Sequence, residues 1–199
     1  MEKGDWTTGS FRPKTIDDMA LYPELKDILL MYAEYGMYEH LVMVGGFGVG
    51  KTTAARILAD SNSFTLMEIA CNVDNTATFM NKLIKQTTST TLFGKPRLII
   101  MDEFHNIKKP VQQLLKKHLE DRKDNNRFIF VVNDYAAVDD SIKSRTAKLI
   151  FDIGIVSEVD NKFKVFKKNT NMNLEGWKQE LKRIAKLVSN RAGKEATDE

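Results

Sequence analysis

The sequence contains one cysteine and three scattered histidines among its 199 residues. An internal disulfide needs two cysteines, and a structural zinc site needs a cluster of cysteine or histidine ligands, so the sequence excludes both. A single cysteine also favours a reducing compartment. No apolar run approaches the ~18 residues of a membrane-spanning helix, and residues 1–10 lack the hydrophobic region of a signal peptide. We therefore expect a cytoplasmic protein with no membrane partner.

The composition is ordinary for a globular protein, with 42% hydrophobic and 29% charged residues. The net charge of +3 hides an asymmetry along the chain. Residues 1–161 carry 20 basic and 22 acidic side chains, whereas residues 162–194 carry ten basic and two acidic ones. Such a basic segment is either a solvated helix face or a surface that meets an anionic partner, and the sequence leaves both open.

One stretch organises the chain. The apolar run Leu41–Val44 is typical of a short buried strand, the pattern G-x-x-x-x-G-K-T follows from Gly45 to Thr52, and a helical run follows over residues 53–59. This order of strand, glycine loop and helix is the context of a Walker A phosphate loop. The alternative is a glycine-rich turn before a helix.

Each part of the loop has a predicted task. Backbone N–H groups and the helix N-terminus would face phosphate oxygens. The ammonium group of Lys51 would reach the β- and γ-phosphates of ATP, and the hydroxyl of Thr52 would hold Mg²⁺. The predicted nucleotide-binding residues of the loop are Gly45, Gly46, Phe47, Gly48, Val49, Gly50, Lys51, Thr52 and Thr53.

Two further apolar strands end in polar residues. The run 97–101 leads into Asp102 and Glu103, a Walker B pattern in which Asp102 would bind Mg²⁺ and Glu103 would polarise the attacking water. Alone, such a pair marks only a strand that leaves the core. Asn133 follows the run 128–132, and the alternative is that it only starts a turn. Because ligands bind outside the carboxyl ends of parallel strands, we expect all three side chains to converge on the phosphate loop.

The remaining pattern predicts an α/β fold of the P-loop NTPase type, a parallel sheet sandwiched by helices with a short partial helical lid. The predicted domains are an ATPase core over residues 1–153 and a basic partial lid with a C-terminal tail over 154–199.

Further strands are predicted over 64–71 and 147–151, and a strand or extended linker over 162–167. Helices are predicted over 22–35, 76–86, 108–123 and 174–190, with inward residues Phe79, Leu83 and Ile84 in the second, and Val111, Leu114, Leu115 and Leu119 in the third.

The order of five segments resembles the clamp-loader branch of the AAA+ ATPases, in particular the ATPase subunits of T4-like phages and of replication factor C. These segments are Phe-Arg-Pro-Lys-Thr-Ile-Asp-Asp at 11–18, the phosphate loop, Ile-Ile-Met-Asp-Glu-Phe at 99–104, Phe-Val-Val-Asn at 130–133 and Ile-Lys-Ser-Arg-Thr at 142–146. The resemblance covers roughly residues 9–190. If the chain is phage-encoded, its compartment is the host cytoplasm.

The resemblance implies roles for single residues. Arg12 and Pro13 would lie beside the adenine of ATP, and Asn133 would be the sensor-1 residue that feels the γ-phosphate. Arg145 matches the arginine of the family's Ser-Arg-Cys motif, with Thr146 in place of cysteine, and would enter the ATP site of a neighbouring subunit. An exposed charge with no evident partner in its own chain is the alternative for Arg145. The helix after Walker B would face DNA, with Gln112 and Gln113 on it and phosphate contacts from Lys108, Lys109, Lys116 and Lys117.

The implied function is an Mg²⁺- and ATP-dependent clamp-loader-like ATPase. Its partners would be other clamp-loader subunits in a homo- or hetero-oligomeric ring, a sliding clamp and primer–template DNA. A helicase-loader-type or other DNA-remodelling ATPase, and a nucleotide-sensing scaffold that does not hydrolyse ATP, stay open as alternatives. No segment matches the family's sensor-2 region or its helical collar. Either this is a minimal or truncated member, or another chain supplies these parts.

Overall fold

A computed structural model describes residues 12–73, 75–88, 96–120, 126–151, 156–159 and 162–165. The chain forms two units. The larger is Asp27–Asp152, and the smaller combines Met1–Lys26 with Ile153–Glu199. The larger unit carries the phosphate loop and both Walker strands. The predicted domain boundary at residue 153 stays a prediction.

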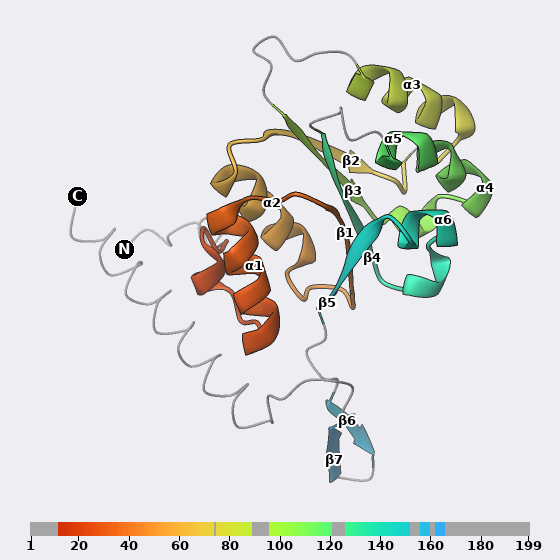
Figure 1. Ribbon diagram of the computed structural model, residues 1–199. Helices are drawn as coiled ribbons and strands as arrows, with labels where there is room; N and C mark the ends of the chain where they lie inside the picture. Colours follow the sequence, from red (N-terminus) through yellow and green to blue (C-terminus); the bar gives the residue numbers. More distant parts are fainter. Residues whose placement is uncertain are drawn as a thin grey trace, which may run out of the picture. The chain divides into compact units, whose positions relative to one another are not determined.

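A five-stranded parallel sheet forms the larger unit (Figure 1). Its strands lie in the order β2 (Thr65–Ala70), β3 (Arg97–Asp102), β4 (Arg127–Val132), β1 (His40–Gly45) and β5 (Thr146–Phe151). The register pairs Val42 of β1 with Phe130 of β4 and with Lys148 of β5. The chain leaves β1 for the edge strand β2 and later returns to the other side of β1. The carboxyl ends of β1, β3 and β4 therefore lie side by side, where parallel sheets bind ligands.

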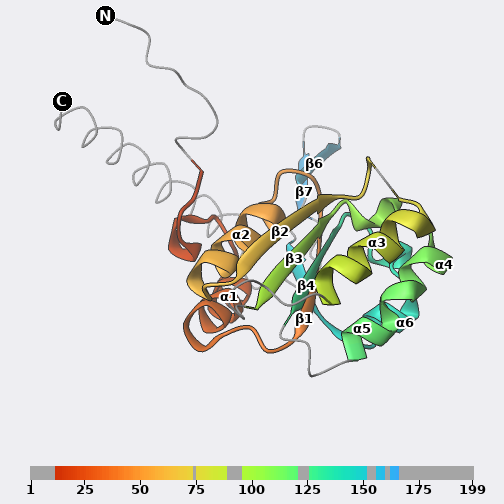
Figure 2. The same ribbon diagram turned by 90° about the horizontal axis from the view of Figure 1, so that it is seen from above.

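Helices cover both faces of this sheet. Helix α2 (Lys51–Ser61) lies on one face, and α3 (Ala77–Thr88), α4 (Lys109–Gln112), α5 (Lys116–Glu120) and α6 (Asp140–Lys143) lie on the other (Figures 1 and 2). Helix α1 spans Pro23–Tyr35. Short 3-10 turns are η1 (Ile16–Asp18), η2 (Phe104–Asn106), η3 (Gln113–Leu115) and η4 (Tyr135–Ala137). The predicted α/β sandwich of the P-loop type is confirmed.

The core explains why the central strands read as unbroken apolar runs. Strands β3 and β4 are buried along most of their length, because both of their faces are covered, whereas the edge strand β2 is largely exposed. On the side of α3 to α6, one cluster joins Val42, Met101 and Phe130 of the sheet to Met80 and Leu115 of the helices. This core holds the ends of the strands, and the polar residues that follow them, in fixed positions.

Two helices differ in detail from their predictions. In α3 the buried apolar residues are Met80 and Leu83, whereas Phe79 is only partly buried. The predicted continuous helix over residues 108–123 is broken into α4, η3 and α5. The tighter 3-10 turn shifts the inward face so that Leu115 and Leu119 are buried, as predicted, while Leu114 is exposed. Its predicted end at residue 123 lies outside the described residues.

A two-stranded antiparallel hairpin, β6 (Val156–Val159) and β7 (Lys162–Val165), belongs to the smaller unit. It shows that residues 162–165 form a strand, one of the two predicted alternatives for that stretch. The predicted helix over 174–190 lies outside the described residues. Among the described helices, none has the length and apolar character to cross a bilayer.

Candidate nucleotide site

The phosphate loop joins β1 to α2 and needs glycine at three positions, one of which is Gly48 with φ 72°. Gly50 has φ 95°, a left-handed conformation that side chains disfavour, and it immediately precedes the first residue of α2. A Cβ atom on Gly45 would lie 2.1 Å from the carbonyl oxygen of Phe151, so β1 and β5 approach too closely there for any side chain. The loop therefore delivers the N-terminus of α2 to the carboxyl end of the sheet, where its N–H groups favour an anion.

The Lys51 side chain lies inside this loop and is only 7% exposed. Its ammonium group donates to the carbonyl oxygens of Gly45 at 2.8 Å and Gly46 at 2.5 Å, and to Asn133 Oδ1 at 3.2 Å. Burial lowers the pKa of Lys51, and the negative charge of Asp102 opposes that shift. Because its direct partners are neutral oxygens, the ammonium is held in place but not charge-neutralised. An anionic ligand would stabilise it.

Thr52 and Asp102 form the part of the site that could hold a metal. The Thr52 hydroxyl donates to Asp102 Oδ2 at 3.0 Å, and Asp102 Oδ1 accepts the backbone N–H of Glu103 at 2.9 Å. A hydroxyl and a carboxylate side by side next to a phosphate loop fit Mg²⁺, which takes one or two protein oxygens and completes its shell with phosphates and water. The described residues contain no group of three acidic, histidine or cysteine side chains that would hold a metal without a nucleotide.

Glu103 has an unusual backbone conformation, with φ 53° and ψ 38°, directly after β3. Its Oε2 accepts from Asn106 Nδ2 at 3.4 Å, and Asn75 Nδ2 donates to the carbonyl of Asn106 at 3.3 Å. The contact of Asn106 with Glu103 was not predicted from the sequence. The only available signal was its position three residues after Glu103, which a single turn returns to the same side.

One cavity of about 270 Å³ is lined by most of the residues predicted for the phosphate loop and the strand ends, although Gly45 and Gly46 do not line it. It is lined by Phe47, Gly48, Val49, Gly50, Lys51, Thr52, Thr53, Asp102, Glu103, Val131 and Asn133. The structure thus brings the loop, the two Walker B carboxylates and Asn133 together from three strand ends. Val131 was not predicted to line the site, although its position two residues before Asn133 places both on one side of β4.

Two further groups of predicted residues are not among these lining residues. Arg12 and Pro13 belong to the smaller unit, where Arg12 is exposed, and their contact with adenine stays a prediction. The four predicted DNA contacts are all exposed, as phosphate-binding lysines must be; they are Lys108, Lys109, Lys116 and Lys117.

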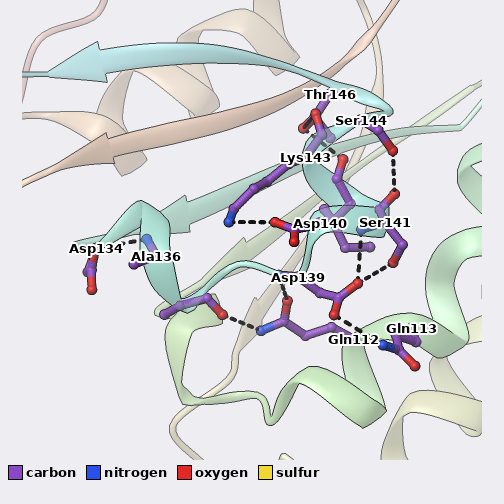
Figure 3. Close-up of polar contacts among 12 residues, drawn as sticks. Gln112, Gln113, Asp134, Ala136, Asp139, Asp140, Ser141, Lys143, Ser144 and Thr146 are labelled. Atoms are coloured by element: carbon purple, nitrogen blue, oxygen red, sulfur yellow. Dashed lines mark hydrogen bonds and ion pairs between the residues drawn. The ribbon is translucent and has the colours of Figure 1, made fainter.

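Gln112 contradicts its predicted position facing DNA, because its side chain is fully buried. Its amide nitrogen donates to the carbonyls of Ile107 at 2.8 Å and Ala137 at 3.0 Å. Its oxygen accepts the backbone N–H of Asp139 at 2.7 Å (Figure 3). The neighbouring Gln113 is exposed and donates to Asp139 Oδ2 at 3.1 Å. Gln112 therefore ties α4 to the segment before α6 and is not available to DNA.

Arg145 also differs from expectation, because it has a partner in its own chain. Its Nε donates to Glu120 Oε1 at 3.0 Å, and its Nη2 forms an ion pair with the same oxygen. The side chain of Arg145 is 22% exposed and that of Glu120 is 50% exposed. Arg145 is absent from the cavity lining described above. This position leaves a role at a neighbour's site as a prediction.

The sequence of this chain is similar to those of known ATPases. The sequence profile of the "ATPase family associated with various cellular activities (AAA)" matches residues 41–152. The replication factor C small subunit of Saccharolobus solfataricus is 29% identical over 148 residues, covering 71% of this chain and 45% of that protein. Small subunit 2 of Pyrobaculum aerophilum is 28% identical over 148 residues, covering 71% and 46%. The chain spans about half the length of the curated relatives it matches.

A solved structure supports the fold. The RuvB Holliday junction branch migration motor of Thermotoga maritima matches with a TM-score of 0.58 and 22% identity, covering 74% of this chain and 50% of that one. The similarity to clamp-loader ATPases predicted from five short segments is confirmed by the sequence relatives. Because the family profile matches more than half of the chain and includes the whole cavity lining, this protein belongs to the AAA family of ATPases.

Proposed function

We propose that the chain is an Mg²⁺- and ATP-dependent subunit of a clamp-loader-like ATPase, which helps to place a sliding clamp on primer–template DNA. The observation that carries the proposal is the sequence similarity to replication factor C small subunits over 71% of the chain. The cavity supports the chemistry, since it combines a buried lysine, the hydroxyl–carboxylate pair of Thr52 and Asp102, a second carboxylate and an amide around one phosphate loop.

In this proposal, each polar residue of the cavity has its own role in ATP hydrolysis. Thr52 and Asp102 would hold Mg²⁺, which neutralises charge on the phosphates when bound. Lys51 would exchange its carbonyl partners for β- and γ-phosphate oxygens. Asn133, already 3.2 Å from the Lys51 ammonium, would contact the γ-phosphate. Glu103 would orient the attacking water and accept its proton.

The nucleotide would control assembly through a difference in affinity. ATP would favour an assembled form that grips clamp and DNA, and hydrolysis would remove the γ-phosphate and release them. The site lies at the carboxyl ends of the strands. We infer that a neighbouring subunit completes it with that subunit's own Arg145. Hydrolysis would then depend on other subunits in a homo- or hetero-oligomeric ring.

The test of this function is steady-state ATPase activity of the chain together with its candidate partner subunits. We expect a several-fold rise when primer–template DNA and a sliding clamp are added together. A rise that needs single-stranded DNA or a helicase instead would indicate a helicase loader. A rate that stays at background under all three conditions would indicate a nucleotide-sensing scaffold.

The lysines after Walker B offer a separate prediction about DNA. Lys116 and Lys117 are exposed on α5. Each phosphate contact contributes about −0.9 to the slope of log affinity against log salt concentration. Replacing both with alanine should therefore flatten the slope by roughly two units, with little dependence on DNA sequence. Fluorescence anisotropy across a salt series measures it.

A matched control uses two exposed lysines of α3. Lys82→Ala with Lys85→Ala removes the same charge from another helix and should leave the slope near its wild-type value. If both double variants flatten the slope equally, the effect is one of net charge, and α5 is an ordinary solvated helix. Lys108→Ala with Lys109→Ala should behave like the α5 pair.

A further inference from the structure

The guanidinium group of Arg145 is heavily engaged within its own chain. Nε and Nη2 both donate to Glu120 Oε1, and Nη1 donates to the carbonyl of Ser141 at 2.7 Å and to Ser144 Oγ at 2.8 Å. A guanidinium has five N–H bonds, so these four contacts leave one for a ligand. The edge formed by Nε and Nη2, which would bind a phosphate with two hydrogen bonds, is occupied by Glu120.

The contact between Arg145 and Glu120 joins two elements that have roles in the proposed function. Glu120 is the last residue of α5, the helix that carries Lys116 and Lys117, and Arg145 follows α6. The hydrogen bond from Arg145 lowers the pKa of Glu120, and the charge of Lys116 acts in the same direction. The carboxylate is therefore ionised at neutral pH and competes directly with any anion for the guanidinium.

We propose that Glu120 is a positioning residue that acts through Arg145, holding the guanidinium on its own chain until the γ-phosphate of a neighbour's nucleotide replaces the carboxylate. The inference rests on the proposed function, because it needs Arg145 to act at a neighbouring site. Exposed ion pairs are weak and bias such an exchange by at most about five-fold. A γ-phosphate with more than one negative charge can therefore displace Glu120 without unfolding α5 or α6.

The Glu120→Gln variant tests the proposal in the complete assembly, without DNA. The neutral amide cannot hold the guanidinium as strongly, so the ATPase kcat should rise by about two- to five-fold. ATP affinity of the isolated subunit should not change, since neither residue lines the cavity. Glu120→Asp keeps the charge and should return kcat toward the wild-type value. In the Glu120→Gln, Arg145→Ala double variant the gain should vanish.

Asp140→Asn is the matched control. Asp140 is an exposed carboxylate at the start of α6, and it forms an ion pair at 2.9 Å with Lys143 of the same helix (Figure 3). None of the described interactions joins Asp140 to the side chain of Arg145. Its loss removes the same charge and should leave kcat unchanged. An equal rise in this variant would overturn the proposal, because it would show a general charge effect.

The remaining outcomes separate this inference from the proposed function. If Arg145→Ala is inactive but Glu120→Gln has an unchanged or lower kcat, the role of Glu120 is overturned and that of Arg145 stands. If Arg145→Ala is as active as wild type, both roles are overturned. If the wild-type assembly fails to hydrolyse ATP, the proposed function is overturned, and the role of Glu120 with it.

Discussion

Replacing Lys51 with alanine should severely weaken ATP binding. The structure places its ammonium inside the phosphate loop, 2.8 Å from the Gly45 carbonyl and shielded from solvent. Among the described residues that line the cavity, Lys51 is the only lysine or arginine. Loss of one partner in a buried charged hydrogen-bond pair costs about 2–5 kcal/mol. This corresponds to roughly 30-fold to several thousand-fold in Kd. Titration of the isolated subunit with a fluorescent ATP analogue measures the change.

Replacing Glu103 with glutamine should have the opposite pattern. The proposed metal-binding pair, Thr52 and Asp102, does not involve the Glu103 side chain, so ATP affinity should stay within a few-fold of wild type. Hydrolysis should fall by about 10²–10⁴, the usual contribution of a general base. Single-turnover measurements at saturating ATP separate this loss of rate from any loss of binding.

Two observations would contradict these assignments. An equal loss of ATP affinity in both variants would remove the catalytic role of Glu103, since it would then act in binding. An unchanged affinity in Lys51→Ala would show that the loop binds no phosphate. Lys82→Ala, an exposed lysine on α3, is the control for the loss of one positive charge, and thermal unfolding of each variant checks that the fold is intact.

Arg145→Ala should bind ATP normally as an isolated subunit and lose hydrolysis in the assembly. Its side chain is held by Glu120 and does not line the cavity of its own chain. An arginine that stabilises charge developing on a neighbour's γ-phosphate is worth ~10³–10⁵ in rate in other phosphoryl-transfer systems. Lysine should restore little activity, because it lacks the planar fork that donates two parallel hydrogen bonds.

Mixing inactive subunits shows whether Arg145 acts across an interface. Lys51→Ala subunits keep an intact arginine, and Arg145→Ala subunits keep an intact phosphate loop. In mixed assemblies some interfaces combine both intact parts, so partial activity should return. A mixture as inactive as either parent, with co-assembly shown by mass measurement, would count against action in trans.

Much of the site followed from the sequence, because its parts are encoded locally. The phosphate loop is eight consecutive residues, and Gly45 and Gly50 mark a close backbone approach and a left-handed turn within it. Strands covered on both faces must be apolar throughout, so β1, β3 and β4 were visible as runs. Their parallel arrangement then required Asp102 and Asn133 to lie near Lys51, as the structure shows.

The side chains that pack between elements could not be placed in the same way. Periodicity assigned Leu114 to the buried face of its helix, but in the structure Leu114 is exposed and Gln112 is buried. From the sequence alone, a glutamine at such a position is expected to lie on the polar surface of the helix. Only the structure shows that three backbone groups, from Ile107, Ala137 and Asp139, satisfy its amide and make its burial favourable.

By itself, the sequence determined the fold class, the phosphate loop and the convergence of the Walker residues, because each depends on neighbouring residues or on the parallel order of strands. The tertiary structure alone decided the surroundings of Gln112 and the pairing of Arg145 with Glu120. The contacts of Gln112 with Ala137 and Asp139, and of Arg145 with Glu120, join residues 25 or more positions apart on α4, α5 and the segments flanking α6. They depend on how short helices pack against one sheet, and neither spacing nor composition encodes that packing.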